Sequence, residues 1–314
     1  MNISHEGKQG LDIQKKIKEK KEKRKLLKQT EKVVPIFLFL CALFSVIATL
    51  GIVFTLLKEA ITFFSAVPMK EFFFNNTWSP WSGEFGVIPL ISGTLLITCI
   101  AIVVALPLGI AAAIFLSEYA SDKTRRIIKP TLEVLAGIPT VVYGFFALTF
   151  ITPLFEKIIP ELPIFNALSA GIVVGVMIIP MIASLSEDAM NAVPNSLREG
   201  ALAMGATRFE VATKVVLPAA FSGVVASIVL AVSRAIGETM IVTIAAGQTP
   251  NLTFNPTESI QTLTAFIVQG AKGDTTYGST IYYSIYAVGI TLFVFTLLMN
   301  FLSQYIVRKY REEY

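Results

Sequence analysis

Six long apolar runs separate the charged segments of this 314-residue chain. A helix that crosses a bilayer needs about 20 apolar residues in succession, and only helices or closed barrels satisfy their backbone polar groups away from water. Charged residues make up 15% of the chain, against about 25% in soluble domains. We therefore expect an all-α integral membrane protein with about six transmembrane helices. The runs lie at residues 33–57, 88–116, 132–154, 168–186, 219–247 and 281–306.

Basic residues are concentrated in alternate segments between these runs. Most of the 26 Lys and Arg lie in four segments, residues 1–32, 117–131, 187–218 and 307–314. The segments on the other side of the runs contain only Lys58, Lys70, Lys157 and Lys272. Lys and Arg accumulate on the cytoplasmic side of membrane proteins. We therefore expect both termini and the loop 187–218 to face the cytoplasm.

The chain is expected to divide into a basic cytoplasmic tail, residues 1–32, and a transmembrane domain, residues 33–314. The first apolar run is too long for the core of a signal peptide and lacks a convincing cleavage site, so we interpret it as a retained anchor. The lysine-rich segment 15–25 is interpreted as a solvated helix that sets the topology. A contact of this segment with anionic lipid is the alternative.

Proline and glycine are expected to break two of the spans. Pro107 and Gly109 interrupt the second apolar run, and Gly137-Ile138-Pro139 interrupts the third. A proline removes an intrahelical hydrogen bond and bends a helix. A membrane tolerates such a break where neighbouring helices or water satisfy the freed carbonyl.

The outer loops carry two further signals. We interpret the aromatic residues of loop 58–87 as a belt at the lipid headgroups, with a stacked cluster as the alternative. They are Phe72, Phe73, Phe74, Trp78 and Trp81. Residues 260–267, in the outer loop 248–280, are expected to form a short helix.

The charged loop between the fourth and fifth runs contains two helix-start signals. Ser196-Leu197-Arg198-Glu199 and Thr207-Arg208-Phe209-Glu210 both fit the capping box, in which the first and last residues bond each other's backbone N–H groups. Gly205 suits the left-handed residue that follows a helix. We predict a helix–turn–helix whose second helix runs towards Pro218. The apolar residues 201–204 suit insertion into a groove on a partner protein.

The same loop resembles the EAA motif of ABC-importer permeases. The shared pattern is Glu-x-Ala-x3-Gly-x9-[Ile/Val]-x-Leu-Pro, and Gly200 replaces the motif's central alanine, which we expect to loosen the helix slightly. By this resemblance the first helix seats in a cleft of a separate ATPase subunit. The residues assigned to ATPase coupling are Glu199, Gly200, Ala201, Gly205, Leu217 and Pro218.

Residues 135–147 and 234–240 resemble the PstC-type permeases of bacterial phosphate importers, and the resemblance covers roughly residues 35–310. Met240 and Ile241 favour this type over the sister PstA type, whose segment runs Gly-Glu-Thr-Ala-Pro. The resemblance implies a type I ABC importer permease fold in the plasma membrane of a bacterium. It also implies a second, PstA-like permease, two copies of an ATP-binding subunit and an extracytoplasmic phosphate-binding protein.

Arg234 and Glu238 are the charged residues that lie deep in an expected span. A charge at this depth costs at least about 2.5 kcal/mol and marks a functional site by default. Because the two residues are four apart on one helix, they can form an ion pair that braces the bundle. Alternatively, Arg234 meets an anionic substrate through two parallel hydrogen bonds, and Glu238 keeps the affinity low enough for release. The family resemblance favours this substrate-pathway interpretation.

The chain lacks the Gly-x4-Gly-Lys-[Ser/Thr] loop that binds nucleotide phosphates. Asp122-Lys123-Thr124 also lacks the following glycine and the nucleotide domain of a P-type pump. We therefore expect a transport subunit and not an enzyme, with no catalytic residue, no cofactor and no nucleic-acid partner. Cys41, Cys99 and His5 predict neither a disulfide nor a metal site.

The function we expect is phosphate import driven by the partner ATPase, which pulls on the hairpin at residues 196–218. Three alternatives remain. The first is a permease for another oxyanion, such as phosphonate, sulfate or molybdate, or the PstA-type sister subunit. The second is a gradient-driven transporter or channel, which would usually carry more ionisable residues within its spans. The third is a non-transporting scaffold that binds a sensor kinase.

Overall fold

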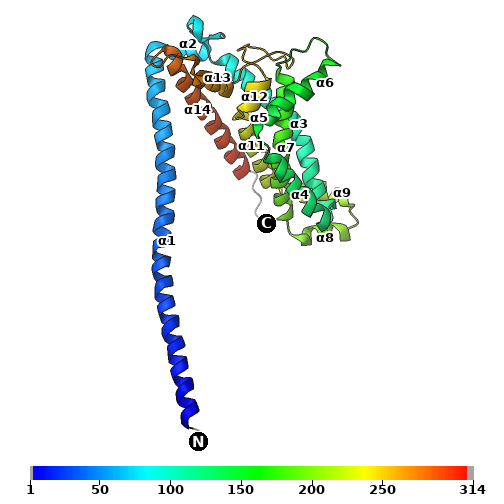
Figure 1. The fold of residues 1–314 in the computed structure, drawn as a ribbon. Helices are drawn as coiled ribbons and strands as arrows, with labels where there is room; N and C mark the ends of the chain where they lie inside the picture. Colours follow the sequence, from blue (N-terminus) through cyan, green and yellow to red (C-terminus); the bar gives the residue numbers. More distant parts are fainter. Residues whose placement is uncertain (1–2, 310–314) are drawn as a thin grey trace. The chain divides into compact units, whose positions relative to one another are not determined.

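The computed structural model describes the backbone of residues 3–309 and the side chains of residues 34–305, apart from Asp274 and Ser303 (Figure 1). The chain forms two compact units, residues 1–55 and 56–314.

The first unit belongs to a single long helix, α1 (Ile3–Ala66), which passes through Pro35 without ending. Although residues 34–55 are apolar, nearly all of their side chains are exposed. The basic side chains of the tail lie outside the described side chains. The tail boundary at residue 32 and the lipid contact therefore stay predictions.

The second unit contains the other helices and one small β-hairpin. Its α-helices are, in chain order, α2 (Met69–Phe74), α3 (Ile88–Ile114), α4 (Asp122–Ala136), α5 (Thr140–Phe146), α6 (Thr152–Glu156), α7 (Ala167–Asn191), α8 (Asn195–Ala203), α9 (Arg208–Glu210), α10 (Leu217–Ala219), α11 (Phe221–Ile236), α12 (Met240–Ala245), α13 (Leu263–Gln269) and α14 (Thr280–Lys309). The 3-10 turn is η1 (Pro80–Ser82), and the π-helical turns are η2 (Phe115–Tyr119), η3 (Ala147–Ile151), η4 (Val211–Val216) and η5 (Gly270–Asp274). The antiparallel strands are β1 (Trp78–Ser79) and β2 (Glu84–Phe85), with Trp78 opposite Phe85.

Four helices in the described residues are long and apolar enough to cross a membrane. They are Val34–Ala66, Ile88–Tyr119, Ala167–Asn191 and Thr280–Leu302. Two bent pairs also qualify if each is counted as one span. These are Asp122–Ala136 with Thr140–Glu156, bent by 86°, and Arg208–Ala219 with Phe221–Ile236, bent by 75°. The described part of the chain thus offers up to six spans, which confirms the all-α membrane fold.

Only one of the two predicted helix breaks is present. The chain does bend at Gly137-Ile138-Pro139, between α4 and α5. By contrast, α3 continues through Pro107 and Gly109, so the break predicted there is wrong. A Cβ atom at Gly109 would lie 2.7 Å from Cγ2 of Ile182 in α7. A proline inside a helix removes one hydrogen bond without ending the helix here, and α1 likewise continues through Pro35.

The centre of the second unit is the contact between α3 and α7. A Cβ atom at Gly171 would lie 2.7 Å from Cβ of Ile100, and one at Gly175 would lie 2.9 Å from the carbonyl oxygen of Ala101. Small residues at such crossings let two helix backbones approach closely in a membrane. The core around this contact also takes buried side chains from α11 and α12.

An aromatic cluster lies at the end of the unit that contains α2 and α13 (Figure 1). Phe72 and Trp78 are buried in it, and the Trp78 ring packs edge-on against Phe266 with centroids 4.7 Å apart. The belt interpretation is therefore wrong for these two residues, because packing against α13 removes them from the surface. Phe74 and Trp81 remain exposed. The short helix expected near residues 260–267 is present as α13.

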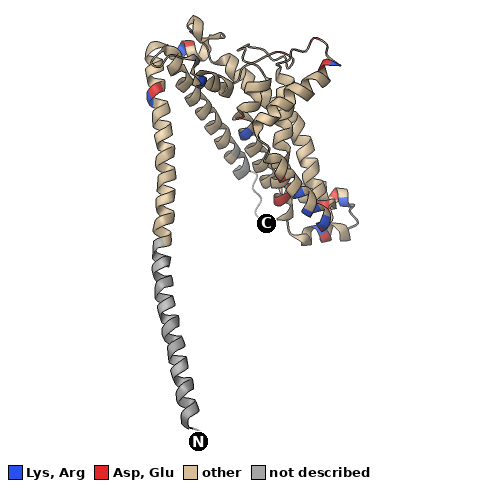
Figure 2. Ribbon diagram, viewed as in Figure 1, with Lys and Arg blue, Asp and Glu red and all other residues tan. Residues whose placement is uncertain are grey.

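The opposite end of the second unit contains α4, α8 and α9 (Figure 1). Charged residues gather at this end, whereas the described parts of α3, α7 and α14 between the two ends of the unit are almost free of them (Figure 2). The predicted hairpin and a network of ion pairs both lie at this end, which makes it the candidate functional site.

Candidate functional site

The predicted helix–turn–helix is present, and its turn is fixed by backbone hydrogen bonds. Helix α8 is followed by Gly205, which has a φ of +86°. The Gly205 N–H donates to the carbonyl of Leu202 at 3.0 Å, and the Ala206 N–H donates to the carbonyl of Ala201 at 3.2 Å. These two bonds form a Schellman motif, which satisfies carbonyls left free at the end of a helix. The prediction that Gly205 is the left-handed residue after the first helix is thus confirmed.

The second helix of the hairpin begins with the predicted capping box. The Thr207 hydroxyl accepts from the Glu210 N–H at 3.3 Å, and Glu210 Oε2 accepts from the Thr207 N–H at 3.0 Å. The backbone bond from Thr207 and the side-chain bond from Lys214 lower the pKa of Glu210 to about 2. The cap is therefore ionised throughout the physiological range. The helix continues through η4 to α10, as expected, and then bends into α11.

The first predicted capping box is wrong. Helix α8 begins at Asn195, directly after Pro194, and has no side-chain cap. Pro194 has a φ of −58°, and the helix starts immediately behind it. Ser196 is consequently already inside the first turn, where it no longer occupies the non-helical N-cap position.

Large apolar side chains are exposed on the hairpin. Leu202 and Phe209 are exposed, and Met204 is 88% exposed. Ala201, in contrast, packs against the cluster formed by the ends of α3, α7 and α11. The hairpin thus has one side held by the bundle and one side free for a partner.

The structure places the six predicted coupling residues along both helices of this hairpin. Glu199, Gly200 and Ala201 lie in α8, with Gly205 in the turn. Leu217 and Pro218 lie in α10, at the far end of the second helix. A Cβ atom at Gly200 would have no neighbour within 4 Å, so the departure from the motif has no steric cause in this chain.

Arg234 and Glu238 do not form an ion pair in the described structure, and this pair is the less favoured of the two interpretations of the sequence. Helix α11 ends at Ile236, so the two residues no longer share a helix face. Glu238 instead caps α12, and its Oε1 accepts from the N–H groups of Met240 and Ile241 at 3.1 and 3.3 Å.

The two charged residues also differ in exposure. The Glu238 residue is buried. The Arg234 residue is exposed, and the hydrogen-bond partner of its guanidinium among the described residues is the sulfur of Met177, at 3.9 Å. A thioether is a weak acceptor, so the hydrogen-bonding capacity of Arg234 is largely unused.

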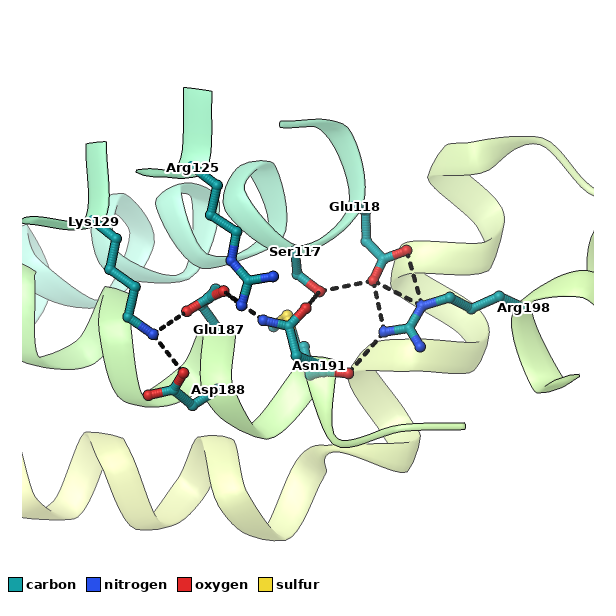
Figure 3. A network of polar contacts seen from close by, with 9 residues as sticks. Ser117, Glu118, Arg125, Lys129, Glu187, Asp188, Asn191 and Arg198 are labelled. Carbon is teal, nitrogen blue, oxygen red and sulfur yellow. Dashed lines mark hydrogen bonds and ion pairs between the residues drawn. The ribbon is translucent and has the colours of Figure 1, made fainter. Parts of the chain in front are cut away.

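A buried carboxylate at the end of α7, Glu187, was not predicted from the sequence. Glu187 is fully buried and forms ion pairs with Arg125 and Lys129 of α4, the latter at 2.7 Å (Figure 3). Asn191 also donates to Glu187, and Asp188 makes a second ion pair with Lys129. A buried charge is tolerated only when it is paired and hydrogen-bonded.

Arg198 of α8 forms the other half of this network. Its Nη2 lies 3.1 Å from Oε1 of Glu118, which belongs to η2 at the end of α3 (Figure 3). The guanidinium also donates to the backbone carbonyls of Val193 and Met190, at 2.6 and 2.7 Å. The hairpin is thereby tied to the ends of both α3 and α7.

The sequence did contain a signal for part of this network. Arg125 and Lys129 are four residues apart, which places them on one face of a helix. Glu187 and Asp188 directly follow an apolar run. The apolar run predicted from the sequence ends at residue 186, which places these carboxylates in the loop 187–218, whereas α7 extends to Asn191. Within the described residues, no group of three or more His, Cys, Asp or Glu is placed to hold a metal ion.

The bundle and its hairpin define the class of ABC-importer permeases, and solved structures of this class share the fold. The inward-facing MetNI methionine ABC transporter matches with a TM-score of 0.54 and 21% identity, over 75% of this chain and all of that one. A bacterial alginate ABC transporter matches with a TM-score of 0.61 and 16% identity, over 87% and 94% of the two chains. The type I importer permease fold is thereby confirmed.

Residues 105–312 match the family described as binding-protein-dependent transport system inner membrane component, and this chain belongs to that family. Its members are multi-pass permease subunits, which work with a separate ATPase and a binding protein and are not enzymes themselves.

Relatives within the family are similar over most of the chain. The probable ABC transporter permease protein YqgH of Bacillus subtilis is 38% identical, over 84% of this chain and 87% of the relative. The phosphate transport system permease protein PstC of Pasteurella multocida is 36% identical, over 79% and 82%. A probable PstC of Methanocaldococcus jannaschii is 30% identical, over 80% and 87%. The resemblance to PstC-type permeases is thus confirmed.

Proposed function

We propose that this chain is the PstC-type permease subunit of an ATP-driven importer that carries inorganic phosphate into the cell. The observation that carries the proposal is the capped hairpin, whose exposed side presents Leu202, Met204 and Phe209. The substrate is supported by the relatives named PstC, which are 30–36% identical over about four fifths of the chain.

The hairpin is proposed to receive force from the ATPase. The Schellman motif at Gly205 and the capping box at Thr207 fix the angle between its helices, so a push on one helix moves both. The exposed apolar side chains suit the helix-in-groove mode of binding. We assign the ATPase contact to Glu199, Gly200, Ala201, Gly205, Leu217 and Pro218.

Two consecutive helical segments lead from the hairpin to the proposed substrate pathway. The second helix bends by 75° into α11, and Arg234 lies in the last turn of α11. We propose that ATP binding closes the ATPase pair, moves the hairpin and rocks α11, while the substrate passes Arg234 and Glu238. The weakly engaged guanidinium of Arg234 can donate two parallel hydrogen bonds to a phosphate.

The partners follow from this assignment. We propose two copies of an ATP-binding subunit, a second, PstA-like permease and an extracytoplasmic phosphate-binding protein. The location is the plasma membrane of a bacterium, with both termini in the cytoplasm. The bias of Lys and Arg towards four of the segments supports this orientation.

Reconstitution tests the function directly. The four kinds of subunit are placed in vesicles, and ATP-dependent entry of radiolabelled phosphate is measured with and without the ATPase. We expect uptake that requires the ATPase, and that excess unlabelled phosphate suppresses far more than sulfate, molybdate or methylphosphonate does. Uptake that persists without the ATPase would identify a gradient-driven transporter. Stronger suppression by another oxyanion would reassign the substrate.

A further inference from the structure

Arg198 connects helix α8 to two other parts of the bundle. Its guanidinium spans three backbone or side-chain groups from two other elements: Glu118 of η2, and the carbonyls of Met190 and Val193 at the end of α7. The side chains of Arg198 and Glu118 are only 15% and 9% exposed. A lysine could not make these contacts together, because its ammonium is a point charge without a planar fork.

A second set of contacts joins α7 to α4. Glu187 of α7 is fully buried and is held by Arg125 and Lys129 of α4. Helix α4 leads across the bend at residues 137–139 into α5, and Tyr143 and Gly144 of α5 are buried in the bundle. A displacement of α7 at this end is therefore passed to α4.

Asn191 connects the two sets of contacts. Its side-chain amide donates to Glu187, and its carbonyl oxygen accepts from the Ser117 hydroxyl at 3.4 Å. The Ser117 hydroxyl shares its single hydrogen between this long contact and the shorter one to Oε1 of Glu118, at 2.8 Å. Figure 3 shows these side chains as one line of polar contacts from α4 to the hairpin.

We propose that this line of contacts is the joint through which movement of the hairpin reaches α3, α4 and α7. Glu118, Arg198 and Glu187 are its positioning residues. Exposed ion pairs contribute little to the stability of a protein. Removing one partner of a buried ion pair is strongly destabilising, because it leaves the other charge buried without a partner. The network therefore holds α8 against η2 and the end of α7, and the buried Glu187 extends it to α4. This inference rests on the proposed function, in which α8 receives the force.

The first experiment tests the joint without any partner. The full chain is placed in lipid nanodiscs, and amide hydrogen exchange is measured for residues 195–206. We expect Glu118→Gln and Arg198→Lys each to raise exchange there about tenfold or more, because hydrogen bonds to charged groups are among the stronger ones. Arg126→Gln is the matched control, since Arg126 is an exposed neighbour of Arg125 without a hydrogen bond or ion pair in the described part of α4.

Unchanged hydrogen exchange in both variants would overturn the proposal that these contacts hold the hairpin in place. The double variant gives an internal check: residues that act through each other show effects smaller than the product of the single effects. A fully multiplicative effect would mean that Glu118 and Arg198 hold the hairpin independently, which contradicts the proposal.

The second experiment measures phosphate taken up per ATP hydrolysed in the reconstituted importer. Glu118→Gln and Arg125→Gln are expected to lower this ratio about tenfold, by the same hydrogen-bond argument, while ATPase binding and hydrolysis persist. A normal ratio despite a loosened hairpin would overturn the role in transmission. If the wild-type chain imports another substrate or binds no ATPase, the proposed function fails, and the exchange experiment still decides whether the joint exists.

Discussion

Glu187 and Arg234 carry their charges in opposite surroundings. Glu187 is fully buried, and Arg125, Lys129 and Asn191 satisfy its oxygens. Arg234 is exposed, and among the described residues its guanidinium reaches only the weak acceptor Met177. A fully satisfied buried charge has a structural role, since nothing further can bind it. An arginine with unused donors remains available to an anion.

Arg234 therefore gives the first prediction at the scale of the residue. Arg234→Gln removes the charge and is expected to lower phosphate uptake at least about tenfold, because hydrogen bonds between charged groups are worth about 1.5–3 kcal/mol each. The complex should still assemble, since Arg234 makes only a weak internal contact. Uptake by reconstituted vesicles and copurification of the ATPase are the two measurements.

Arg234→Lys is the matched variant for this prediction. It keeps the positive charge but loses the planar fork, so we expect an intermediate rate of uptake. Normal uptake by Arg234→Gln would remove this side chain from the substrate pathway. Loss of assembly in both variants would assign it to bracing the bundle.

The charge of Glu238 is stabilised by the N-terminal end of a helix and not by an ion pair. Its carboxylate caps α12 through the N–H groups of Met240 and Ile241. An anion is stabilised at a helix N-terminus by the free N–H groups and the helix dipole. Thr264 of α13 also donates to the Glu238 carbonyl at 2.7 Å. This bond joins the break between α11 and α12 to the end of the unit that contains α2 and α13.

At the scale of the element, the hairpin is stiff because its short helices are closed at the turn. The backbone bonds around Gly205 end α8, and the Thr207–Glu210 box begins the next helix immediately afterwards. Each capping interaction contributes about 0.5–2 kcal/mol. An isolated helix of nine residues such as α8 would be marginal in water, so these bonds and the packing of Ala201 are needed to keep it formed.

Gly205→Val is expected to uncouple ATP hydrolysis from uptake. A side chain in the left-handed region costs about 1–2 kcal/mol, and a branched one costs more, so the turn must change its angle. The protein should still enter the membrane, because Gly205 packs against nothing: a Cβ atom there has no neighbour within 4 Å. The ratio of uptake to hydrolysis is the quantity to measure.

Gly278→Val is the matched control for the turn. Gly278 also has a left-handed φ, of +82°, and equally open surroundings, but it lies in the loop before α14 and not in the hairpin. Its backbone strain is therefore similar, and coupling should be retained. Full coupling in Gly205→Val would contradict a role of the hairpin, whereas uncoupling in both variants would point to a general effect of strain.

At the scale of the whole molecule, the second unit has two chemically different ends. One end contains the aromatic cluster around Trp78, and the other contains the hairpin and a concentration of charged residues (Figure 2). The proposed topology assigns the charged end to the cytoplasm, where Lys and Arg accumulate. The relative position of the two ends across the bilayer can be tested with single cysteines.

The topology predicts opposite labelling of Met204 and Tyr277, which are 88% and 82% exposed. Cys41 and Cys99 are first replaced by alanine, and Met204→Cys or Tyr277→Cys is then introduced. A membrane-impermeant maleimide should label Tyr277→Cys in intact cells. It should label Met204→Cys only after the membrane is opened. Labelling of Met204→Cys in intact cells would place the hairpin outside and remove it from any cytoplasmic ATPase.

What the sequence determined by itself is local. The apolar runs predict the spans because a helix needs only its own residues to satisfy its backbone in lipid. Gly205 and the Thr207–Glu210 box predict the hairpin because their bonds reach only a few residues along the chain. The bend at residues 137–139 has the same local origin.

The tertiary structure decided the features that depend on neighbours distant in sequence. Helix α3 continues through Pro107, where the local rule predicts a break, and its Gly109 packs closely against Ile182 of α7. Arg198 pairs with Glu118, which lies 80 residues away along the chain. At the break after Ile236, Thr264 of α13 donates to the Glu238 carbonyl, although the two residues are 26 apart. Helix packing and long-range pairs depend on which elements the assembled bundle brings within reach, and no pattern along the chain specifies those neighbours.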